Sequence, residues 1–424
     1  MPELSVEQRK VLQWVFNESR SIFLTGPAGT GKTVTLNAIV SEAKLRRVKH
    51  GVTALTGSAA FLLGGKTLHS FLGIGLGKKD AKMMAAKTMR NAKRLEKLRD
   101  LEMLVIDEIS MWDKELFEKI STYLQIIRRC QLPFGGVQLI LCGDMCQLQS
   151  VQGEYCFLSK EWDRLGAQPM LLTKIFRQKD AEFMDMLSEL RYGRCSRQVL
   201  ERLRACKHTT FPKGIIPTRM YSLNIDVDRI NKEEFAALNE GNSEGCALKY
   251  VTKYNKTSSF ASTWTQHEVK RWADASGIPE HLELCPGTQV VITWNIGEIG
   301  VVNGTRGVVE KVAQDRVSVR TLNRTLDGAT GIVDVQPITV HMEDDPTASV
   351  TFMPLKHAWA ISIHKSQGMT LDCVEIDLGS SIFAYGQAYT ALSRARNIES
   401  VRITDVKTTS FRTHPAVLGL YGII

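Results

Sequence analysis

Short runs of apolar residues, each followed by polar or glycine-rich residues, recur through the first half of the chain. Three of them, at residues 21–25, 103–106 and 137–142, have the length and composition of strands buried inside a sheet. Helical composition follows the first run, over residues 34–44. Strands buried on both faces are typical of parallel sheets covered by helices. The pattern therefore predicts an α/β fold with parallel sheets.

The pattern changes to alternating strands in the later part of the chain, at residues 289–294, 301–302, 307–312 and 317–322. Asn303-Gly304 is a strong hairpin signal, because both residues tolerate the positive φ of a tight turn. The segment before these strands is polar and irregular from about residue 241. We therefore expect a β-rich insertion over residues 241–351.

Composition adds only broad limits. The chain has 424 residues, 43% apolar and 23% charged, which excludes a disordered chain, a collagen and a coiled-coil rod. No stretch approaches the ~18 uninterrupted apolar residues of a membrane helix, and no signal peptide is recognisable. The net charge of +9 hints at a polyanionic partner. The nine cysteines contain no CxxC pair, so we expect reduced thiols in an intracellular protein and no structural zinc.

Residues 26–33, GPAGTGKT, join the first apolar run to the helical segment. The pattern GxxxxGK[ST] between a strand and a helix is typical of loops that bind phosphate, because glycines let backbone N–H groups surround the oxygens. Lys32 can reach the β- and γ-phosphates, and the Thr33 hydroxyl can bind Mg²⁺. The motif predicts a nucleoside triphosphatase that uses Mg²⁺, with a nucleotide-binding set of Gly26, Gly29, Thr30, Gly31, Lys32 and Thr33.

Two acids follow the second apolar run. Asp107 comes at the carboxyl end of the predicted strand, the edge where open α/β sheets bind ligands. We assign Asp107 to Mg²⁺, directly or through water, and Glu108 to polarising the attacking water. The third run ends in GDMCQL, where Gln147 can either sense the γ-phosphate by hydrogen bonding or, with Asp144, only cap a turn.

The order of motifs identifies a family. The chain contains, in sequence, LSVEQRKVL, GPAGTGKT, TALTGSAA with GGKTLHSFLGIG, VIDEISM, PFGGVQLILCGD, LTKIFRQ, AWAISIHKSQGMTLD and GQAYTALSRAR. This set closely resembles the Pif-type (petite integration frequency) DNA helicases of superfamily one B, relatives of the RecD-like helicases. The resemblance extends from Leu4 to about Ile403, and PFGG, SIHKSQG and ALSRA are its most specific parts.

The resemblance implies two RecA-like domains with ATP between them. The first would span residues 1–172, with a small wedge insertion near 60–76. The second would span residues 173–240 and 352–424, and the insertion at 241–351 would contain an SH3-type barrel. Such proteins move 5′ to 3′ on single-stranded DNA and separate duplexes, including DNA–RNA hybrids. We therefore expect single-stranded and forked duplex DNA as partners, a monomer on DNA, no membrane association, and a role in replication, repair or recombination.

The resemblance also implies roles for single residues. Gln8 would contact the adenine base, and Gln147 would be the γ-phosphate sensor. Arg177 in IFRQ and Arg394 in ALSRA would be the two arginines that the second domain contributes to the γ-phosphate. Gly368, at the end of SIHKSQG, would belong to the nucleotide site.

A nucleic-acid track is expected at the ends of other strands. Thr56 and Gly57 are small residues that can contact sugar and phosphate. His69 and Phe71 can stack on unpaired bases, although a lone His or Phe is more often part of a core. The resemblance adds four further residues to the DNA-binding set, which are His364, Lys365, Gln387 and Tyr389.

Residues 78–99 hold nine Lys or Arg and two acids, with Met and Ala between them. Such a run is usually a solvated face, and in a helicase it is also a plausible patch facing duplex DNA, with binding that should weaken as salt rises.

The chain departs from the family pattern in several places. Gln149 and Ser150 replace two prolines, and His357 stands where many members have Leu before AWA. The chain also begins almost at the adenine-contacting motif, so we expect a minimal motor of viral or phage origin, or one trimmed from a longer protein. Its compartment would be the nucleus or another DNA-containing compartment of a eukaryotic or viral host, or the cytoplasm of a bacterium.

Two other functions compete with a helicase. One is an ATP-driven translocase or remodeller with little strand separation, and the other is a catalytically weak single-stranded DNA-binding module. Intact Lys32, Asp107, Glu108 and Gln147 argue against the second of these.

Overall fold

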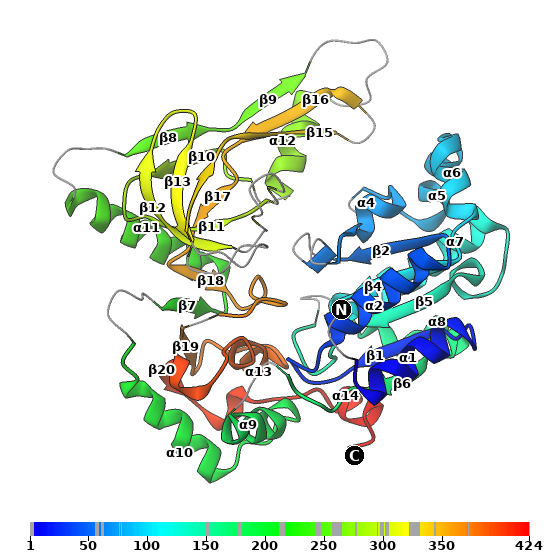
Figure 1. The fold of residues 1–424 in the computed structure, drawn as a ribbon, viewed down its shortest axis with the longest axis horizontal. Coiled ribbons are helices and arrows are strands. Elements are labelled where there is room, and N and C mark those ends of the chain that lie inside the picture. Colours follow the sequence, from blue (N-terminus) through cyan, green and yellow to red (C-terminus); the bar gives the residue numbers. More distant parts are fainter. Residues whose placement is uncertain are drawn as a thin grey trace. The chain divides into compact units, whose positions relative to one another are not determined.

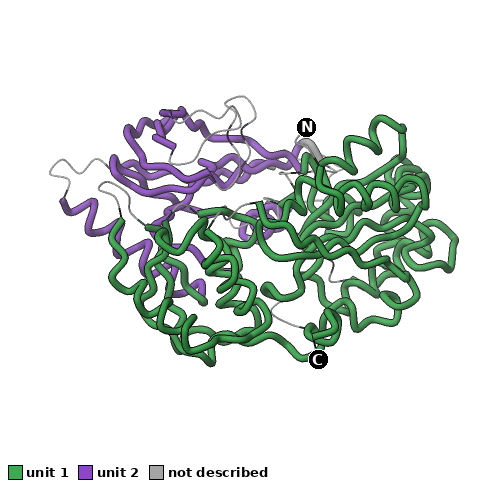
Figure 2. The backbone as a smooth tube through the Cα atoms, turned by 60° about the horizontal axis from the view of Figure 1, so that its bottom comes forward, with its two compact units in different colours: residues 1–222, 363–424 green, residues 223–362 purple. Residues whose placement is uncertain are grey.

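In the computed structural model the chain forms two compact units (Figure 2). The first comprises residues 1–222 and 363–424, and the second comprises residues 223–362. The residues described are 4–55, 59–60, 63–75, 77, 79–149, 153–176, 180–211, 217–241, 247–256, 265–275, 278–294, 296, 301, 305–321, 331–342, 345–371 and 373–423. No helix among these residues combines the length and the apolar character needed to cross a membrane.

The first unit contains a six-stranded parallel sheet in the order β3-β2-β4-β5-β1-β6 (Figure 1). Its strands are β1 (Ile22–Thr25), β2 (His50–Ala54), β3 (Lys66–Thr67), β4 (Met103–Asp107), β5 (Gln138–Cys142) and β6 (Gln168–Leu171). The three apolar runs are the neighbouring strands β4, β5 and β1, as the pattern predicts. Because parallel strands end at the same edge, the residues that follow these three strands are brought together.

Helices cover both faces of this sheet. Ile22 and Leu24 of β1 pack in one core with α1 (Val6–Phe16) and α2 (Lys32–Leu45). Phe23 points the other way, and its ring centroid lies 5.2 Å from that of Trp162. The remaining helices of this part are α4 (Leu68–Leu72), α5 (Ala81–Met89), α6 (Ala92–Arg99), α7 (Lys114–Arg128) and α8 (Lys160–Leu165).

The second part of the first unit has its own parallel strands, β7 (Thr218–Tyr221), β19 (Val374–Leu378) and β20 (Val401–Val406), with β19 in the middle. Its helices are α9 (Ala181–Arg191), α10 (Arg197–Ala205), α13 (Gln387–Leu392) and α14 (Pro415–Leu420). Two parallel sheets with flanking helices fit a pair of RecA-like domains.

The second unit is built on antiparallel sheets and two helices. Five strands run in the order β14-β13-β12-β11-β17, a pair joins β8 to β10, and three strands run β15-β16-β9. The strands of these sheets are β8 (Leu248–Val251), β9 (Lys253–Lys256), β10 (His281–Leu284), β11 (Gln289–Ile292), β12 (Arg306–Val312), β13 (Val317–Thr321), β14 (Ile332–Val335), β15 (Ile338–Met342), β16 (Asp345–Phe352) and β17 (Leu355–His357). Strand β18 (Ala360–Ser362) lies outside these three sheets, and the helices of the unit are α11 (Asn224–Gly241) and α12 (Gln266–Ala275).

Three of the four predicted strands of the insertion correspond to β11, β12 and β13. Val301 forms only an isolated bridge with Ile296, and Asn303-Gly304 lies outside the described residues. The second unit, residues 223–362, includes more residues than the insertion predicted at 241–351. It includes α11 because the Asn231 side chain donates to Ala360 O at 3.1 Å and accepts from Ala360 N at 3.0 Å, which fixes the helix to the end of the unit.

Candidate functional site

The phosphate-binding loop has the backbone that its glycines predict. Gly26, Gly29 and Gly31 have φ of 150°, 84° and 81°. A Cβ on Gly26 would lie 2.5 Å from Leu172 O, and one on Gly31 would lie 2.9 Å from Gln8 Nε2. Only glycine fits these two positions without a clash. The loop therefore leads from β1 directly into the N-terminus of α2.

Lys32 begins α2 and its ammonium group is bound only to carbonyls of the same loop. Its Nζ donates to Gly26 O at 2.7 Å and to Pro27 O at 3.0 Å. Burial lowers the pKa of Lys32, while the carboxylates of Asp144 and Glu108 act in the opposite direction. Thr33 is exposed in the first turn of α2. A buried cation and a helix N-terminus together make a site for an anion.

Two carboxylates lie at the end of β4. Asp107 is only 8% exposed, and its Oδ1 accepts a hydrogen bond from Glu108 N at 2.9 Å. Burial raises the pKa of Asp107. Burial, with repulsion from Asp107, raises the pKa of Glu108 to about 7. A carboxylate with a raised pKa is a better proton acceptor, which suits a group that orients or deprotonates water.

Cys142 supports this pair from the end of β5. Its thiol donates a hydrogen bond to Asp107, and burial raises the pKa of the thiol well above its usual value, so it stays protonated. Sequence analysis noted Cys142 only as a strand residue. No group of three or more His, Cys, Asp or Glu in the described part of the chain could hold a metal by itself.

The second RecA-like part brings two side chains and one glycine to the same place. Arg394 is 2% exposed, and its Nη2 donates to Gln147 Oε1 at 3.2 Å. Gln367 Nε2 lies 3.5 Å from Glu108 Oε2 and 3.4 Å from Ser110 Oγ. A Cβ on Gly368 would lie 3.6 Å from Glu108 Oε1. Burial lowers the pKa of Arg394, although nearby Glu108 opposes this shift.

The predicted site residues are therefore largely brought together. The structure places Lys32, Asp107, Glu108, Gln147 and Arg394 around the end of one sheet. Arg177 lies outside the described residues, as do Thr56 and Gly57 of the DNA-binding set.

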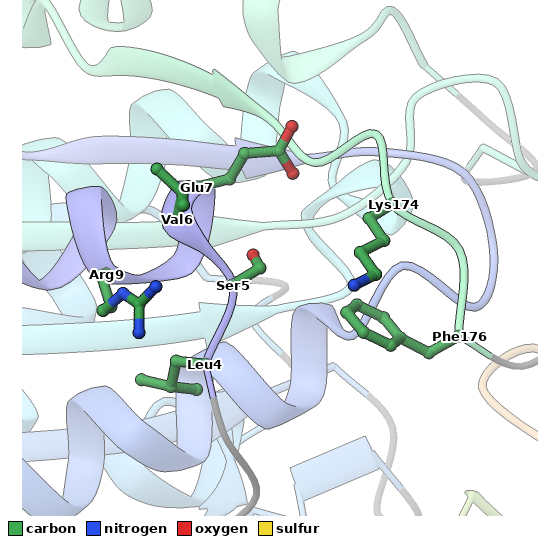
Figure 3. A pocket seen from close by; sticks show the side chains of 7 residues that line it. All are labelled: Leu4, Ser5, Val6, Glu7, Arg9, Lys174 and Phe176. Atoms are coloured by element: carbon green, nitrogen blue, oxygen red, sulfur yellow. The ribbon is translucent and has the colours of Figure 1, made fainter.

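Gln8 is held by the start of α1. Its Oε1 accepts from Ser5 N at 2.8 Å while Ser5 Oγ accepts from Gln8 N at 3.3 Å, which is a capping box. Gln8 Nε2 reaches Gly31 O at 3.4 Å. Next to this contact is a pocket of ≈ 480 Å³ with Phe176 and Lys174 on one side and the start of α1 on the other (Figure 3). Phe176 is 47% exposed, so its ring is available to a planar ligand.

A buried ion pair joins the two RecA-like parts, and sequence analysis did not find it. Arg191, the last residue of α9, donates to Asp144 Oδ1 through Nη2 at 2.8 Å, and its Nε lies 3.2 Å from both carboxylate oxygens. The side chains are 1% and 0% exposed. Burial alone would raise the pKa of Asp144, but Arg191 reverses this and holds it below its usual value. A single Arg at a helix end gave no signal in the sequence, because most such residues are solvated.

Two tyrosines complete this network. Tyr389 OH donates to Asp144 Oδ2 at 3.3 Å and accepts from Ala28 N of the phosphate-binding loop at 3.3 Å. Tyr421 OH lies 2.6 Å from Thr25 Oγ1 and accepts from Met145 N at 3.2 Å. The network therefore links the phosphate-binding loop and the end of β5 to α9, α13 and α14.

Three residues of the predicted DNA-binding set are buried in this structure. Tyr389 is 2% exposed and belongs to the network just described. Gln387 is 0% exposed, and its Oε1 accepts from Phe383 N at 3.0 Å and Ala384 N at 3.2 Å. Phe71 is 6% exposed, lies against Gly51 and has Lys97 Nζ 3.9 Å from its ring centre. None of these three side chains is accessible to DNA in this structure, because other parts of the protein cover them.

The other three described members remain accessible. Lys365 is exposed, and His364 and His69 are half-buried. Burial lowers the pKa of both histidines, so both are neutral at pH 7.

Comparison with known proteins decides the family. A family model described as PIF1-like helicase matches residues 3–201. The ATP-dependent DNA helicase Pif1 of Bdellovibrio bacteriovorus is 32% identical over 426 residues, covering 99% of this chain and 92% of that protein. The chain belongs to the PIF1-like helicase family. The resemblance found in the sequence motifs is thereby confirmed.

Other members of the PIF1-like family extend the comparison. The human ATP-dependent DNA helicase PIF1 is 38% identical over 431 residues, which is 100% of this chain and 64% of the human protein. The chain thus spans about 64% of the length of that relative. The crystal structure of Pif1 helicase from Candida albicans superposes with a TM-score of 0.87 at 33% identity, covering 100% of this chain and 99% of that one. A Bacteroides Pif1 structure in complex with ADP-AlF3 and ssDNA gives a TM-score of 0.73 at 26% identity, covering 100% and 97%.

Proposed function

We propose that this chain is an ATP-dependent DNA helicase that moves 5′ to 3′ on single-stranded DNA and separates duplexes or DNA–RNA hybrids. The observation that carries the proposal is the meeting of Lys32, Glu108 and Arg394 at one phosphate-binding loop, with groups drawn from both RecA-like parts. A site completed by a second domain couples hydrolysis to domain motion, which is what a translocating motor requires.

The residues fit a nucleotide and its metal. Gln367 Oε1 is buried without a hydrogen-bond partner among the described residues, beside Glu108, where a bound water could donate a hydrogen bond to it. Lys32 would exchange its two carbonyl partners for phosphate oxygens. Thr33 and Asp107 would hold Mg²⁺, which supplies charge to neutralise the phosphates. The adenine would enter the pocket between Lys174 and Phe176 and the start of α1 (Figure 3).

Each protein group then has a distinct task. Glu108 orients the attacking water and accepts its proton. Arg394 stabilises the charge on the γ-phosphoryl group, because its guanidinium is planar and always protonated. Gln147, which already contacts Arg394, reports whether the γ-phosphate is present. We include Arg177 as the second arginine on the strength of its motif alone.

We propose the domain division from these features. Residues 1–172 form the first RecA-like domain, with residues 60–76 as a wedge that separates strands. The second RecA-like domain comprises residues 173–222 and 363–424, and unit 223–362 takes the place of the insertion predicted at 241–351. The antiparallel strands β14-β13-β12-β11-β17 are proposed to be the SH3-type barrel.

The DNA-binding set is reduced by burial to Thr56, Gly57, His69, His364 and Lys365. We propose that these residues contact single-stranded DNA, without Phe71, Gln387 or Tyr389. One solved Pif1 structure is described as DNA unwinding at forked dsDNA by two coordinating Pif1 helicases. For this chain we propose that one copy suffices on single-stranded DNA and that forks are the duplex substrate.

The test is ATP hydrolysis stimulated by single-stranded DNA. Glu108→Gln should lower kcat by about 10²–10⁴-fold, because it removes the proton acceptor. Lys32→Ala should abolish turnover, because it removes the cation that meets the phosphates. DNA binding, measured by fluorescence anisotropy, should survive in both variants.

Glu115→Gln is the matched control, since this carboxylate is 83% exposed on α7 and pairs only with Lys119. Its ATPase rate should equal that of the parent protein. Normal turnover in Lys32→Ala or Glu108→Gln would refute the site, and a parent protein that hydrolyses ATP without separating strands would favour a translocase.

A further inference from the structure

The positive charge of the chain is concentrated in one short segment. Residues 78–99 carry nine Lys or Arg and two acids, a net +7 of the +9 of the whole chain. The rest of the protein is close to neutral, with +2. Attraction to a polyanion at long range therefore comes mainly from this segment.

The structure turns the cations of this segment to solvent. In α5 and α6 the inward residues are Ala81, Met84, Ala85, Thr88 and Leu98. Five of the exposed cations have no ion-pair partner in the described part of the chain: Lys79, Lys82, Lys87, Arg90 and Lys93. One acid of the segment, Asp80, is engaged by the backbone, since it accepts from Met83 N at 2.8 Å as the N-cap of α5.

The two helices are fixed firmly to the domain. Thr88 Oγ1 lies 2.9 Å from Tyr123 OH, which in turn donates to Leu72 O at 2.9 Å. Arg128 Nη1 donates to Leu98 O at 3.0 Å and Leu101 O at 2.7 Å, just beyond α6. The cations therefore stand on a preformed surface, so binding a ligand orders only their side chains.

This surface continues into the proposed wedge. The Arg94 guanidinium packs against Gly73, where an added Cβ would lie 2.4 Å from its Cζ. Lys97 Nζ lies 3.9 Å from the ring centre of Phe71. Helix α6 thus touches the α4 segment at two points. A duplex that is split at the wedge has to arrive close to these helices.

The composition of the segment indicates which form of DNA it suits. Residues 78–99 contain no Phe, Tyr, Trp or His, so the segment offers no aromatic ring of the kind on which single-strand sites stack unpaired bases. Lys and Arg without aromatic residues suit the phosphate backbone of a duplex, which presents one charge per ≈ 1.7 Å of helix axis. An acidic protein would need apolar anchors as well, and the exposed apolar side chains here are only Met83 and Met89.

We propose that α5 and α6 form a sequence-independent docking surface for the phosphate backbone of duplex DNA, next to the segment where the strands part. The inference rests on the proposed function, because the wedge belongs to it. The surface would hold the duplex arm of a fork in place while the motor draws one strand through.

The test compares the salt dependence of binding for two DNA ligands without ATP. The variant Lys82→Gln/Lys87→Gln/Lys93→Gln keeps helix propensity and removes three charges. For a fork with a duplex arm, the slope of log K against log salt should fall by about 2–3, at ~0.9 for each phosphate that is no longer neutralised. For a single-stranded oligonucleotide of the tail sequence, affinity and slope should be unchanged, as should ATPase activity stimulated by that oligonucleotide.

Two control variants sharpen the result. Lys82→Arg/Lys87→Arg/Lys93→Arg should bind the fork like the parent, because charge is kept. Arg197→Gln/Arg204→Gln/Lys207→Gln removes the same charge from an exposed region around α10 and should leave the fork slope unchanged. Thermal melting checks that each variant is folded.

The proposal is overturned if Lys82→Gln/Lys87→Gln/Lys93→Gln binds the fork with the same slope of log K against log salt as the parent. In that case the helices would face solvent or bind an acidic protein. An equal decrease in the α10 variant would also overturn it, because net charge alone would then explain the effect. A parent protein without ATPase activity would refute the proposed function and leave this binding comparison intact.

Discussion

At the scale of single residues, His357 shows how neighbouring groups determine the packing and the protonation state of one side chain. It stacks on Phe235 with ring centroids 4.7 Å apart and meets Trp359 edge-on at 5.5 Å. Its Nε2 lies 2.8 Å from Glu283 O. Burial lowers the pKa of His357, although the Glu283 carbonyl partly opposes the shift. A neutral imidazole therefore fills the place where the family resemblance leads us to expect Leu.

We expect His357 to make stability depend on pH. Above its ordinary pKa near 6.5 the residue is neutral in both states and its packing contributes fully. As pH falls below 6.5 the unfolded chain binds the proton first, so the free energy of unfolding decreases until pH passes the lowered pKa of the folded state. Urea unfolding at pH 7.5 and 5.0 should therefore show a smaller pH difference for His357→Leu than for the parent.

The control for this measurement is His267→Leu, which alters an exposed histidine on α12 of the same unit. The difference in the free energy of unfolding between pH 7.5 and 5.0 should be the same in His267→Leu as in the parent. Equal pH differences in His357→Leu and the parent would show that His357 does not contribute. His69 and His364 are present in all three proteins, so their own lowered pKa values cancel from the comparison.

At the scale of elements, the buried network fixes how helices meet the sheet. Helix α9 ends in Arg191, which pairs with Asp144 beyond β5, and α13 contributes Tyr389 to the same carboxylate. Tyr389 also accepts a hydrogen bond from Ala28 N. A movement of the phosphate-binding loop therefore has to displace α13 or break this hydrogen bond. The contact thus gives a physical path from the nucleotide site to the second RecA-like part, through hydrogen bonds that are excluded from water.

Breaking this ion pair should be costly. Arg191→Ala leaves the Asp144 carboxylate buried without its cation, which should lower the free energy of unfolding by about 3–5 kcal/mol. Asp144→Asn/Arg191→Met should recover part of that stability, because no unpaired charge remains. Chemical denaturation measures both.

Arg197→Ala provides the comparison, since its side chain is 92% exposed and pairs with Glu201 on α10. Its cost should be about 0–1 kcal/mol, as for other exposed ion pairs. An Arg191→Ala cost as small as this would mean that the network does not hold α9 in place.

At the scale of the whole molecule, the first unit contains two sheets, as the proposed stepping along a DNA strand requires. Two parallel sheets provide two bodies, and the nucleotide site between their strand ends has groups from both. If each body holds DNA and the site opens and closes with hydrolysis, alternating grips give motion in one direction. The proposed 5′-to-3′ direction rests on the family resemblance alone.

The direction can be measured on duplexes with a single tail. We expect unwinding of a duplex that carries only a 5′ single-stranded tail and none of one that carries only a 3′ tail. A blunt duplex and the Lys32→Ala variant serve as controls and should show no strand separation. Unwinding from the 3′ tail alone would contradict the proposed polarity.

The local parts of the site were predictable from the sequence. The phosphate-binding loop and the acids after β4 depend on a few consecutive residues, and each position is limited by backbone geometry or by a neighbouring strand. Gly26 and Gly31 are examples, since their φ values and close contacts leave room only for glycine. The alternating pattern likewise located β11, β12 and β13.

The exposure of a motif residue was not predictable in the same way. Tyr389, Gln387 and Phe71 lie in the expected motifs, yet all three are buried by residues distant in sequence. Burial depends on which segments the fold brings together, and a motif does not contain that information.

The sequence by itself determined the family, the α/β class and the residues around the phosphates, because short-range backbone geometry and charge restrict these positions. Only the tertiary structure decided that Arg191 faces Asp144, that Tyr389 contacts Ala28, and that α11 belongs with residues 223–362. Each of these depends on long-range packing, in which a side chain's partner comes from a segment tens to hundreds of residues away.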